Sequence, residues 1–170
     1  RRMMEYLVTQ AEMKQYDSNT ITHLKMPSVV LMERAALVTV ELLMKELGAA
    51  AYRVLVVAGC GNNGGDGFAI GRLLLLQGCR VDFVLLGSRE KCSEETALQI
   101  DILERYGHSP FDRIPEGEYD IVIDAIFGIG LSRETEGIYR EAVCALNRMH
   151  SYVCAVDIPS GVHAGSGQIL

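Results

Sequence analysis

The sequence predicts an α/β protein in which a parallel sheet is covered by helices on both faces. Two observations predict this class. From about residue 52 onward, apolar runs of strand length alternate with amphipathic segments of helix length. These runs are apolar almost throughout, which is typical of strands buried on both faces of a parallel sheet. With 170 residues the chain has the length of one such domain, and we expect residues 1–170 to form a single unit.

Two helices are expected ahead of the sheet. Thr9 and Glu12 have the spacing of a capping box, which predicts a first helix over residues 9–20. A long second helix is expected over Ser28–Leu47, closed by Gly48. Its apolar residues occupy nearly every face, so we expect one face to pack on the core and another to join two subunits of a homodimer.

The strands and helices of the sheet region follow in alternation. Strands are expected at 52–59, Cys79–Gly87, Tyr119–Asp124 and Ser151–Asp157, with a weak strand or loop at 108–115. Helices are expected at 64–78, at 93–107 with Ser93 as N-cap, and at 137–149. The last ten residues are glycine-rich and lack a closing helix, so we expect a domain truncated at its C-terminal end.

Charge and cysteine content exclude several classes of function. The net charge is −6 without any basic run, which argues against a nucleic-acid partner. No stretch reaches the roughly 18 apolar residues of a membrane span, so no membrane partner is expected. The five cysteines are odd in number and lack a C-x-x-C pair, as in a cytoplasmic protein with reduced thiols. Cys60, inside a glycine loop, is expected to be a packing residue.

Three of the expected strands end in loops of unusual composition. The segments are GCGNNGGDG at 59–67, DAIFGIGLSRE at 124–134 and DIPSG at 157–161. In a doubly wound sheet, ligands bind at the carboxyl ends of the strands, so we expect the three loops to face one crevice.

The first of these loops matches a dinucleotide fingerprint only in part. Gly59, Gly61 and Gly64 satisfy G-x-G-x-x-G. However, the second strand ends without the acidic residue that binds the ribose, because Asp82 lies too early in it. Asp66 stands where a pyrophosphate would be expected and would repel it. The loop therefore argues against an ordinary NAD(P)-dependent oxidoreductase.

The polar residues of the loops admit two interpretations. Asn63, Asp124 and Ser160 offer amide, carboxylate and hydroxyl or carbonyl oxygens, the ligands that hard cations take. Alternatively, the asparagines cap the following helix and hold the turn. Spacing alone leaves both interpretations open.

Taken together, PSVVLMERAA, GNNGGDG, DAIFGIGL and DIPSG occur in an order that resembles the NAD(P)H-hydrate epimerase family, the YjeF amino-terminal domain. The resemblance runs from about residue 9 to residue 169. It implies a three-layer αβα Rossmann-like sandwich, a homodimer and a bound potassium ion. It implies conversion of (6R)- to (6S)-NAD(P)HX, the hydrated and damaged nicotinamide cofactor, in metabolite repair. Some members of the family also carry a C-terminal dehydratase domain.

The resemblance also assigns residues to the substrate and to potassium. Those implied to contact NAD(P)HX are Asn62, Asn63, Gly64, Gly65, Asp66, Gly128, Ile129, Gly130, Leu131, Ser132, Arg133, Glu134 and Asp157. Asn63, Asp124 and Ser160 are implied to hold the potassium ion, Ser160 through its backbone carbonyl.

Three alternatives accompany these assignments. Asp157 is expected to be the catalytic acid/base, and the alternative is an aspartate that only stabilises the turn before Pro159. Asp66 is expected either to contact the substrate or to cap its helix. For the whole protein, the alternative is a non-catalytic, dimeric scaffold on the same fold, which would have no need of an aspartate before Pro159 or of converging oxygen ligands.

Overall fold

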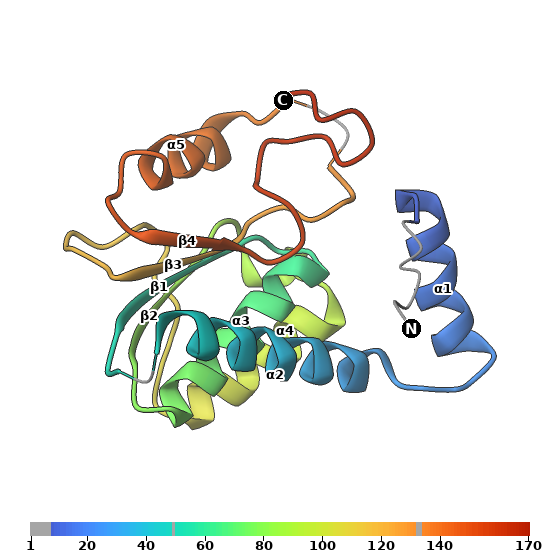
Figure 1. The fold of residues 1–170 in the computed structure, drawn as a ribbon, viewed down its shortest axis with the longest axis horizontal. Coiled ribbons are helices and arrows are strands. Elements are labelled where there is room, and N and C mark those ends of the chain that lie inside the picture. The colour runs from blue at the N-terminus through green and yellow to red at the C-terminus, as the bar shows by residue number, and fades with distance from the viewer. Residues whose placement is uncertain (1–7, 49, 132–133) are drawn as a thin grey trace, which may run out of the picture.

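The computed structural model describes residues 8–48, 50–131 and 134–170, and within them four strands form one sheet. The strands are β1 (Arg53–Ala58), β2 (Arg80–Leu85), β3 (Ile121–Ala125) and β4 (Tyr152–Ala155). Their spatial order is β2-β1-β3-β4, and every neighbouring pair is parallel. The predicted α/β class with a parallel sheet is confirmed (Figure 1).

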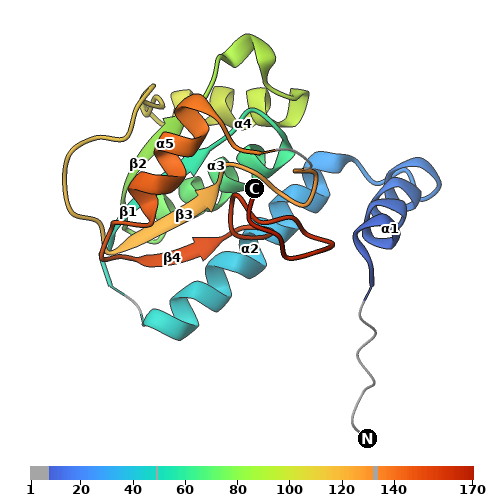
Figure 2. The same ribbon diagram turned by 90° about the horizontal axis from the view of Figure 1, so that it is seen from above.

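Helices lie on both faces of the sheet, in unequal number. The described α-helices are α1 (Gln10–Thr22), α2 (Ser28–Leu47), α3 (Asn62–Leu76), α4 (Glu94–Arg105) and α5 (Gly137–Leu146). Three of them, α2, α3 and α4, cover one face, and α5 covers the other (Figures 1 and 2). The first helix, α1, stands at the side of this sandwich. A short 3-10 helix, η1 (Arg89–Lys91), precedes α4.

Alternate residues of β1 explain why both faces of the sheet are apolar. Val54 and Val56 pack into the core formed with α2, α3 and α4, whereas Leu55 and Val57 pack into the core under α5. All four side chains are fully buried. Burying a side chain of this size contributes about 1.5–3 kcal/mol, so the continuous apolar run favours a central strand.

The two N-terminal helices begin and end close to the predicted residues. The capping box is present, because Thr9 accepts from the Glu12 backbone N–H while the Glu12 carboxylate accepts from the Thr9 N–H at 2.7 Å. The second helix ends before Gly48, whose φ of 86° is a conformation that favours glycine. None of the described helices is long and apolar enough to cross a membrane.

The weak segment at 108–115 forms a single bridge to β2. Phe111 pairs in parallel with Val84: the Phe111 N–H donates to the Phe83 carbonyl at 2.7 Å, and the Leu85 N–H donates to Phe111 at 2.9 Å. With Phe111 counted as a rudimentary third strand, the order along the sheet becomes 3-2-1-4-5. That order is the one found in doubly wound dinucleotide-binding sheets.

The last strand departs from the expectation of strands covered on both faces. Tyr152 and Val153 of β4 are each nearly half exposed, because β4 is short and lies at the edge of the described sheet. The inner strands β1 and β3 carry the buried core instead.

The chain reverses its direction of winding at β1. It leaves β1 for β2 on one side and then returns to β3 on the other side, so the carboxyl ends of β1 and β3 flank a topological switch point. In open α/β sheets a ligand crevice forms at this point.

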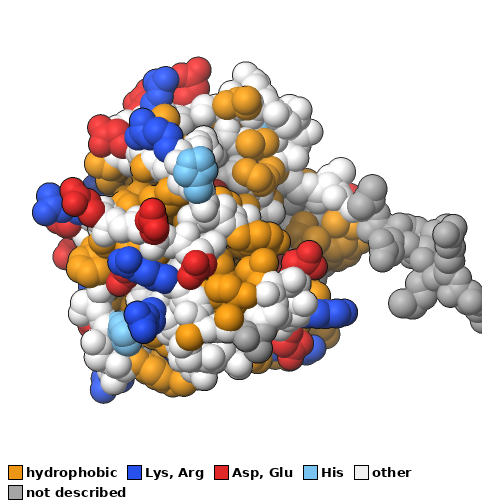
Figure 3. Space-filling view, turned by 60° about the vertical axis from the view of Figure 1, so that its left-hand side comes forward, with side chains coloured by type: hydrophobic (Ala, Val, Ile, Leu, Met, Phe, Trp, Pro, Cys, Tyr) orange, Lys and Arg blue, Asp and Glu red, His pale blue; other side chains and the backbone are white. Residues whose placement is uncertain are grey.

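Charged side chains on the face drawn in Figure 3 are of both signs and interspersed. This face thus presents no continuous basic surface for a nucleic acid.

Candidate active site

A cavity of about 1090 Å³ opens at the carboxyl ends of the strands. It is lined by residues of all three sequence-predicted loops, which confirms that they face one crevice. Residues of α1 and the start of α2 form its opposite side. A volume of this size slightly exceeds the usual range of about 300–1,000 Å³ for ligand pockets, as an extended ligand requires.

The wall formed by α3 depends on glycine. The helix begins at Asn62, two residues before the predicted start, so Asn62 to Gly67 form its first turns rather than a loop. A Cβ on Gly64 would overlap the Gly59 carbonyl, and one on Gly67 would overlap Ala125 of β3. Glycine therefore lets the helix begin directly against the ends of β1 and β3.

Asn63 is buried in this wall without hydrogen-bond partners. Its side chain is 8% exposed, and neither Oδ1 nor Nδ2 has a partner among the described residues. The N-cap of α3 is Gly61, without a side-chain cap, so the alternative in which the asparagines cap the helix is wrong. A buried amide without partners costs free energy, so Asn63 is suited to accept a ligand or an ion.

Gly64 and Gly65 lie behind the cavity wall and do not line it. Gly64 touches the Gly59 backbone, and a Cβ on Gly65 would meet Met32 of α2 and Thr96 of α4. Both glycines therefore position Asn62, Asn63 and Asp66.

Asp66 lines the cavity one helical turn beyond Asn63. Burial first, and the nearby carboxylates of Asp157 and Asp17 second, raise the pKa of Asp66 to about 7. As the fifth residue of α3 it is not the helix cap, so that alternative is wrong. A carboxyl group that titrates near neutral pH and faces a cavity can both donate and accept a proton.

The loop after β3 forms the wall that faces the start of α3, and this wall is called the opposite wall below. Gly128, Ile129, Gly130 and Leu131 line the cavity, whereas Glu134 is exposed and lies outside its lining. The side-chain amide of Gln10 on α1 donates to the Ile129 carbonyl. Ser132 and Arg133, which were also predicted to contact the substrate, lie outside the described residues.

The three loops meet at Gly128. Its missing side chain leaves room for the Asp157 carboxylate, and a Cβ there would also lie 3.3 Å from the Asn63 Cβ. Asp157 Oδ2 accepts from the Ile129 N–H at 3.3 Å. Asp157 therefore stands on the cavity lining, beside the buried amide of Asn63 and in the field of Asp66.

Asp124 of β3 and Ser160 of the third loop are hydrogen-bonded to each other. Asp124 Oδ2 accepts from the Ser160 N–H at 2.8 Å, and its Oδ1 accepts from the Ser160 hydroxyl at 2.6 Å. The same hydroxyl accepts from the Phe127 N–H at 3.0 Å. Asp124 is 6% exposed, and its described partners are neutral donors.

This donor set fits a hard cation. A buried carboxylate without a cationic side chain is costly, and no described Lys or Arg pairs with Asp124. The Ser160 hydroxyl is engaged, which leaves its backbone carbonyl for an ion. No cluster of three or more His, Cys, Asp or Glu exists among the described residues, so the pattern differs from a transition-metal site.

The chain is similar in sequence to known proteins. A family model described as "YjeF-related protein N-terminus" matches residues 28–170. The chain belongs to this family. It is 41% identical to the NAD(P)H-hydrate epimerase of Weissella koreensis, with 96% of this chain and 74% of that protein covered. It is 40% identical to the NAD(P)H-hydrate epimerase of Oenococcus oeni, with 99% and 80% covered.

A solved structure has the same fold as this YjeF-related domain. The crystal structure of yeast ynu0 (YNL200c) matches with a TM-score of 0.80 over 97% of this chain and 75% of that one. The sequence identity is 21%, so this match supports the architecture alone.

The position of Asp82 in the YjeF-related domain agrees with the argument against a redox enzyme. Asp82 accepts from the Tyr119 hydroxyl at 2.9 Å and lies 3.5 Å from Arg53, the first residue of β1. It therefore lies toward the amino end of the sheet, away from the cavity. The ribose-binding carboxylate of an ordinary dinucleotide site would lie at the opposite end.

Several cavity residues escaped prediction from the sequence. Lys14 and Asp17 of α1, Glu95 of α4 and Tyr139 of α5 all line the cavity. The capping box predicted that α1 is a helix, but it did not indicate which of its residues would line the cavity. Lys14 is the only Lys or Arg among the described lining residues, and Asp17, Asp66, Glu95 and Asp157 are the acidic ones.

Proposed function

We propose that this protein is an NAD(P)H-hydrate epimerase, an isomerase that interconverts (6R)- and (6S)-NAD(P)HX in metabolite repair. Two curated relatives at about 40% identity bear this name, and this chain covers at least 74% of each. The observation that carries the proposal is the meeting of Asp157, Asn63 and Gly128 at the switch point of the sheet. A scaffold without catalytic activity would have no use for these converging polar groups.

The reaction requires reversible movement of an oxygen at C6 of the hydrated ring. One route breaks the C6–O bond and adds water from the other face, and another opens and recloses the ring between N1 and C6. Each route needs a proton delivered to one atom and removed from another. Asp157 is the proposed catalytic acid/base, because it lines the cavity and is anchored by the Ile129 N–H.

The remaining contacts follow from the two walls of the cavity. Asn62, Asn63 and Asp66 would hold one side of NAD(P)HX, and the backbone N–H groups of Gly128 and Gly130 would approach its phosphates. Lys14 joins this set as a cation at the α1 side. The described lining carries more acidic than basic side chains and would repel the phosphates. The contacts with Lys14 and with the backbone would offset this repulsion.

We propose potassium as the ion held by Asn63, Asp124 and Ser160. The buried Asn63 amide without partners and the buried Asp124 carboxylate without a cationic partner support this assignment. When bound, the ion would supply positive charge beside the carboxylates and the substrate. Within the protein, Ser160 and the Ile126 N–H orient Asp124.

A homodimer formed through α2 is part of the same proposal. Met32, Ala36, Val40 and Leu43 face the core, while four apolar residues on the outer side are at least 39% exposed: Val30, Leu37, Val38 and Leu42. Sedimentation velocity at micromolar concentration should show a dimer, and the V38E/L42E double variant should shift it to a monomer. A monomeric wild-type protein would remove this part of the proposal.

The deciding experiment measures epimerisation directly. The purified protein is offered (6R)-NADHX together with a dehydratase specific for the S epimer, and recovery of NADH is followed by absorbance. We expect recovery well above the spontaneous rate. Recovery that equals the rate without the protein, under conditions in which the chain is folded, would reject the epimerase in favour of the scaffold.

A further inference from the structure

Two cysteines distant in the sequence lie side by side at the edge of the cavity. Cys60 belongs to the glycine loop after β1 and lines the cavity, and Cys92 directly precedes the N-cap of α4. Their thiols approach the same backbone carbonyl: that of Ser88 is 3.5 Å from Cys60 Sγ and 3.8 Å from Cys92 Sγ. The Cys60 thiol is close enough to contribute to the raised pKa of Cys92.

Hydrogen bonds hold the two backbones together. The Ser93 N–H donates to the Cys60 carbonyl at 2.9 Å, and the Thr96 hydroxyl donates to the Gly61 carbonyl at 2.8 Å. These bonds place the residue that follows Cys92 directly against the Cys60 backbone. Gly87 leaves room for the Cys60 thiol, because a Cβ on Gly87 would lie 2.7 Å from it.

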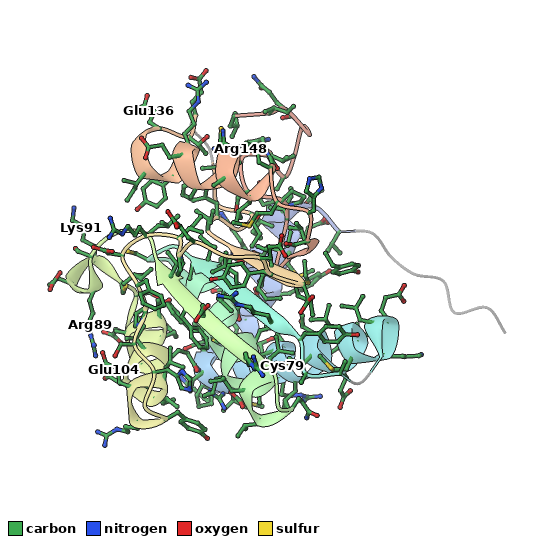
Figure 4. All side chains as sticks on the ribbon, turned by 90° about the vertical axis from the view of Figure 1, so that its left-hand side faces the viewer. Cys79, Arg89, Lys91, Glu104, Glu136 and Arg148 are labelled. Atoms are coloured by element: carbon green, nitrogen blue, oxygen red, sulfur yellow. The ribbon has the colours of Figure 1, made fainter. Side chains whose placement is uncertain are left out.

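The segment that carries Cys92 is also anchored from its other side. In η1, Arg89 forms an ion pair with Glu104 of α4 at 2.7 Å and another with Asp101 (Figure 4). These pairs are exposed and individually weak, but together they tie η1 to the same helix that Ser93 caps. The segment that carries Cys92 is therefore held beside the loop that carries Cys60.

We propose that Cys60 and Cys92 are a redox-active pair that forms a reversible disulfide at the edge of the cavity, with a small disulfide such as oxidised glutathione as the oxidant. The proposal is independent of the epimerase assignment. The other cysteines lie elsewhere, with Cys79 buried beside β2, Cys154 on β4 and Cys144 exposed on α5.

The chemistry proceeds by two exchange steps. The Cys60 thiolate, which is reached from the cavity, attacks one sulfur of oxidised glutathione, and the S–S bond breaks to release one glutathione thiolate. The Cys92 thiol then loses its proton to water and attacks the Cys60 sulfur, which releases the second glutathione. The two protein thiols are oxidised by two electrons, and one glutathione disulfide is reduced to two thiols.

The raised pKa of the Cys92 thiol limits the second exchange step. Burial first, and the neighbouring Cys60 thiol second, raise the pKa of Cys92 to about 11. Few Cys92 thiols are ionised at neutral pH, so we expect the second step to be slow and to accelerate as the pH rises.

The test exposes the folded chain to oxidised glutathione at pH 8 and follows the thiol count and the intact mass. Two of the five thiols should be lost, the mass should fall by two hydrogens, and dithiothreitol should restore both. Peptide mapping without reduction should recover a Cys60–Cys92 cross-link. In the Cys92→Ser variant, Cys60 should instead retain a glutathione adduct.

The matched control is Cys144→Ser, which removes an exposed thiol and should leave the cross-link unchanged. Melting temperatures of all variants establish that each is folded. Five persisting thiols, a stable glutathione adduct on Cys60 of the wild type, or a cross-link of Cys60 through a different cysteine would each overturn the proposal.

Discussion

The two walls of the cavity are built in contrasting ways. The α3 wall carries Asn63 and Asp66 on a helix that Gly64 and Gly67 press against the neighbouring backbone. The opposite wall carries Asp157 just beyond the half-exposed edge strand β4, anchored by a hydrogen bond of 3.3 Å. Packing fixes the first wall, whereas the second is held by few contacts. Substitutions in the α3 wall should therefore affect stability first, and those in the opposite wall should affect turnover first.

The largest expected effect comes from Asp157→Asn in the opposite wall. Replacing the carboxylate by an amide keeps the size of the side chain but removes the proton carrier. The rate of epimerisation should therefore fall by about 10²–10⁴-fold. The melting temperature should change little, because Asp157 is exposed. Rate, melting temperature and affinity for an NADP analogue are measured on one preparation. A folded variant with near wild-type turnover would instead support the turn-stabilising role.

In the α3 wall, Gly64→Ala should reduce stability rather than turnover. The added Cβ overlaps the Gly59 carbonyl, a backbone atom that cannot move freely, so unfolding free energy should fall by about 1–3 kcal/mol or more. Gly61→Ala is the matched control, because a Cβ there meets nothing within 4 Å. Denaturant titrations compare the two variants, and equal midpoints would contradict the close packing of this wall.

The cation site proposed at Asp124 should be detectable by its effect on thermal stability. Potassium should raise the melting temperature more than sodium does, since binding to the native state stabilises it by mass action. For a chain of this length, 1 kcal/mol corresponds to about 2–4 °C. Asp124→Asn should remove the difference, whereas Asp120→Asn, near the other end of β3, should retain it. A potassium effect that persists in Asp124→Asn would place the ion elsewhere.

The last expected effect concerns the titration of Asp66. Its folded pKa of about 7 lies above the ordinary value near 3.9, so between these values the native state holds a proton that the unfolded chain has lost. The stability that Asp66 contributes is complete below about pH 4 and is lost as the pH rises to about 7. Asp66→Asn lacks this dependence, so its melting temperature should rise relative to wild type across that range in potassium-free buffer. Parallel melting curves would contradict the raised pKa.

The sequence predicted the fold and the loops of the site from local signals. Apolar runs located the strands, and the capping box and Ser93 located two helix starts, because these signals depend only on neighbouring residues. The start of α3 was predicted two residues late because asparagine has a low helix propensity, so Asn62 and Asn63 were assigned to the preceding loop.

Other features of the site could not be predicted because they join distant segments. The contribution of Lys14 depends on how α1 lies over the cavity, and the raised pKa of Asp66 depends on burial and on Asp17 and Asp157. The pairing of Cys60 with Cys92 likewise requires the fold, since no C-x-x-C motif marks it.

The peripheral position of α1 has a consequence for how a ligand enters and leaves the cavity. No residue of this helix is buried, yet its Met13, Lys14 and Asp17 form one side of the cavity. Opening it exposes little apolar surface, so its backbone amides should exchange with solvent deuterium far faster than those of the buried helix α3. A bulky ligand can thus enter and leave at the cost of displacing one peripheral helix, while the sheet and its core remain closed.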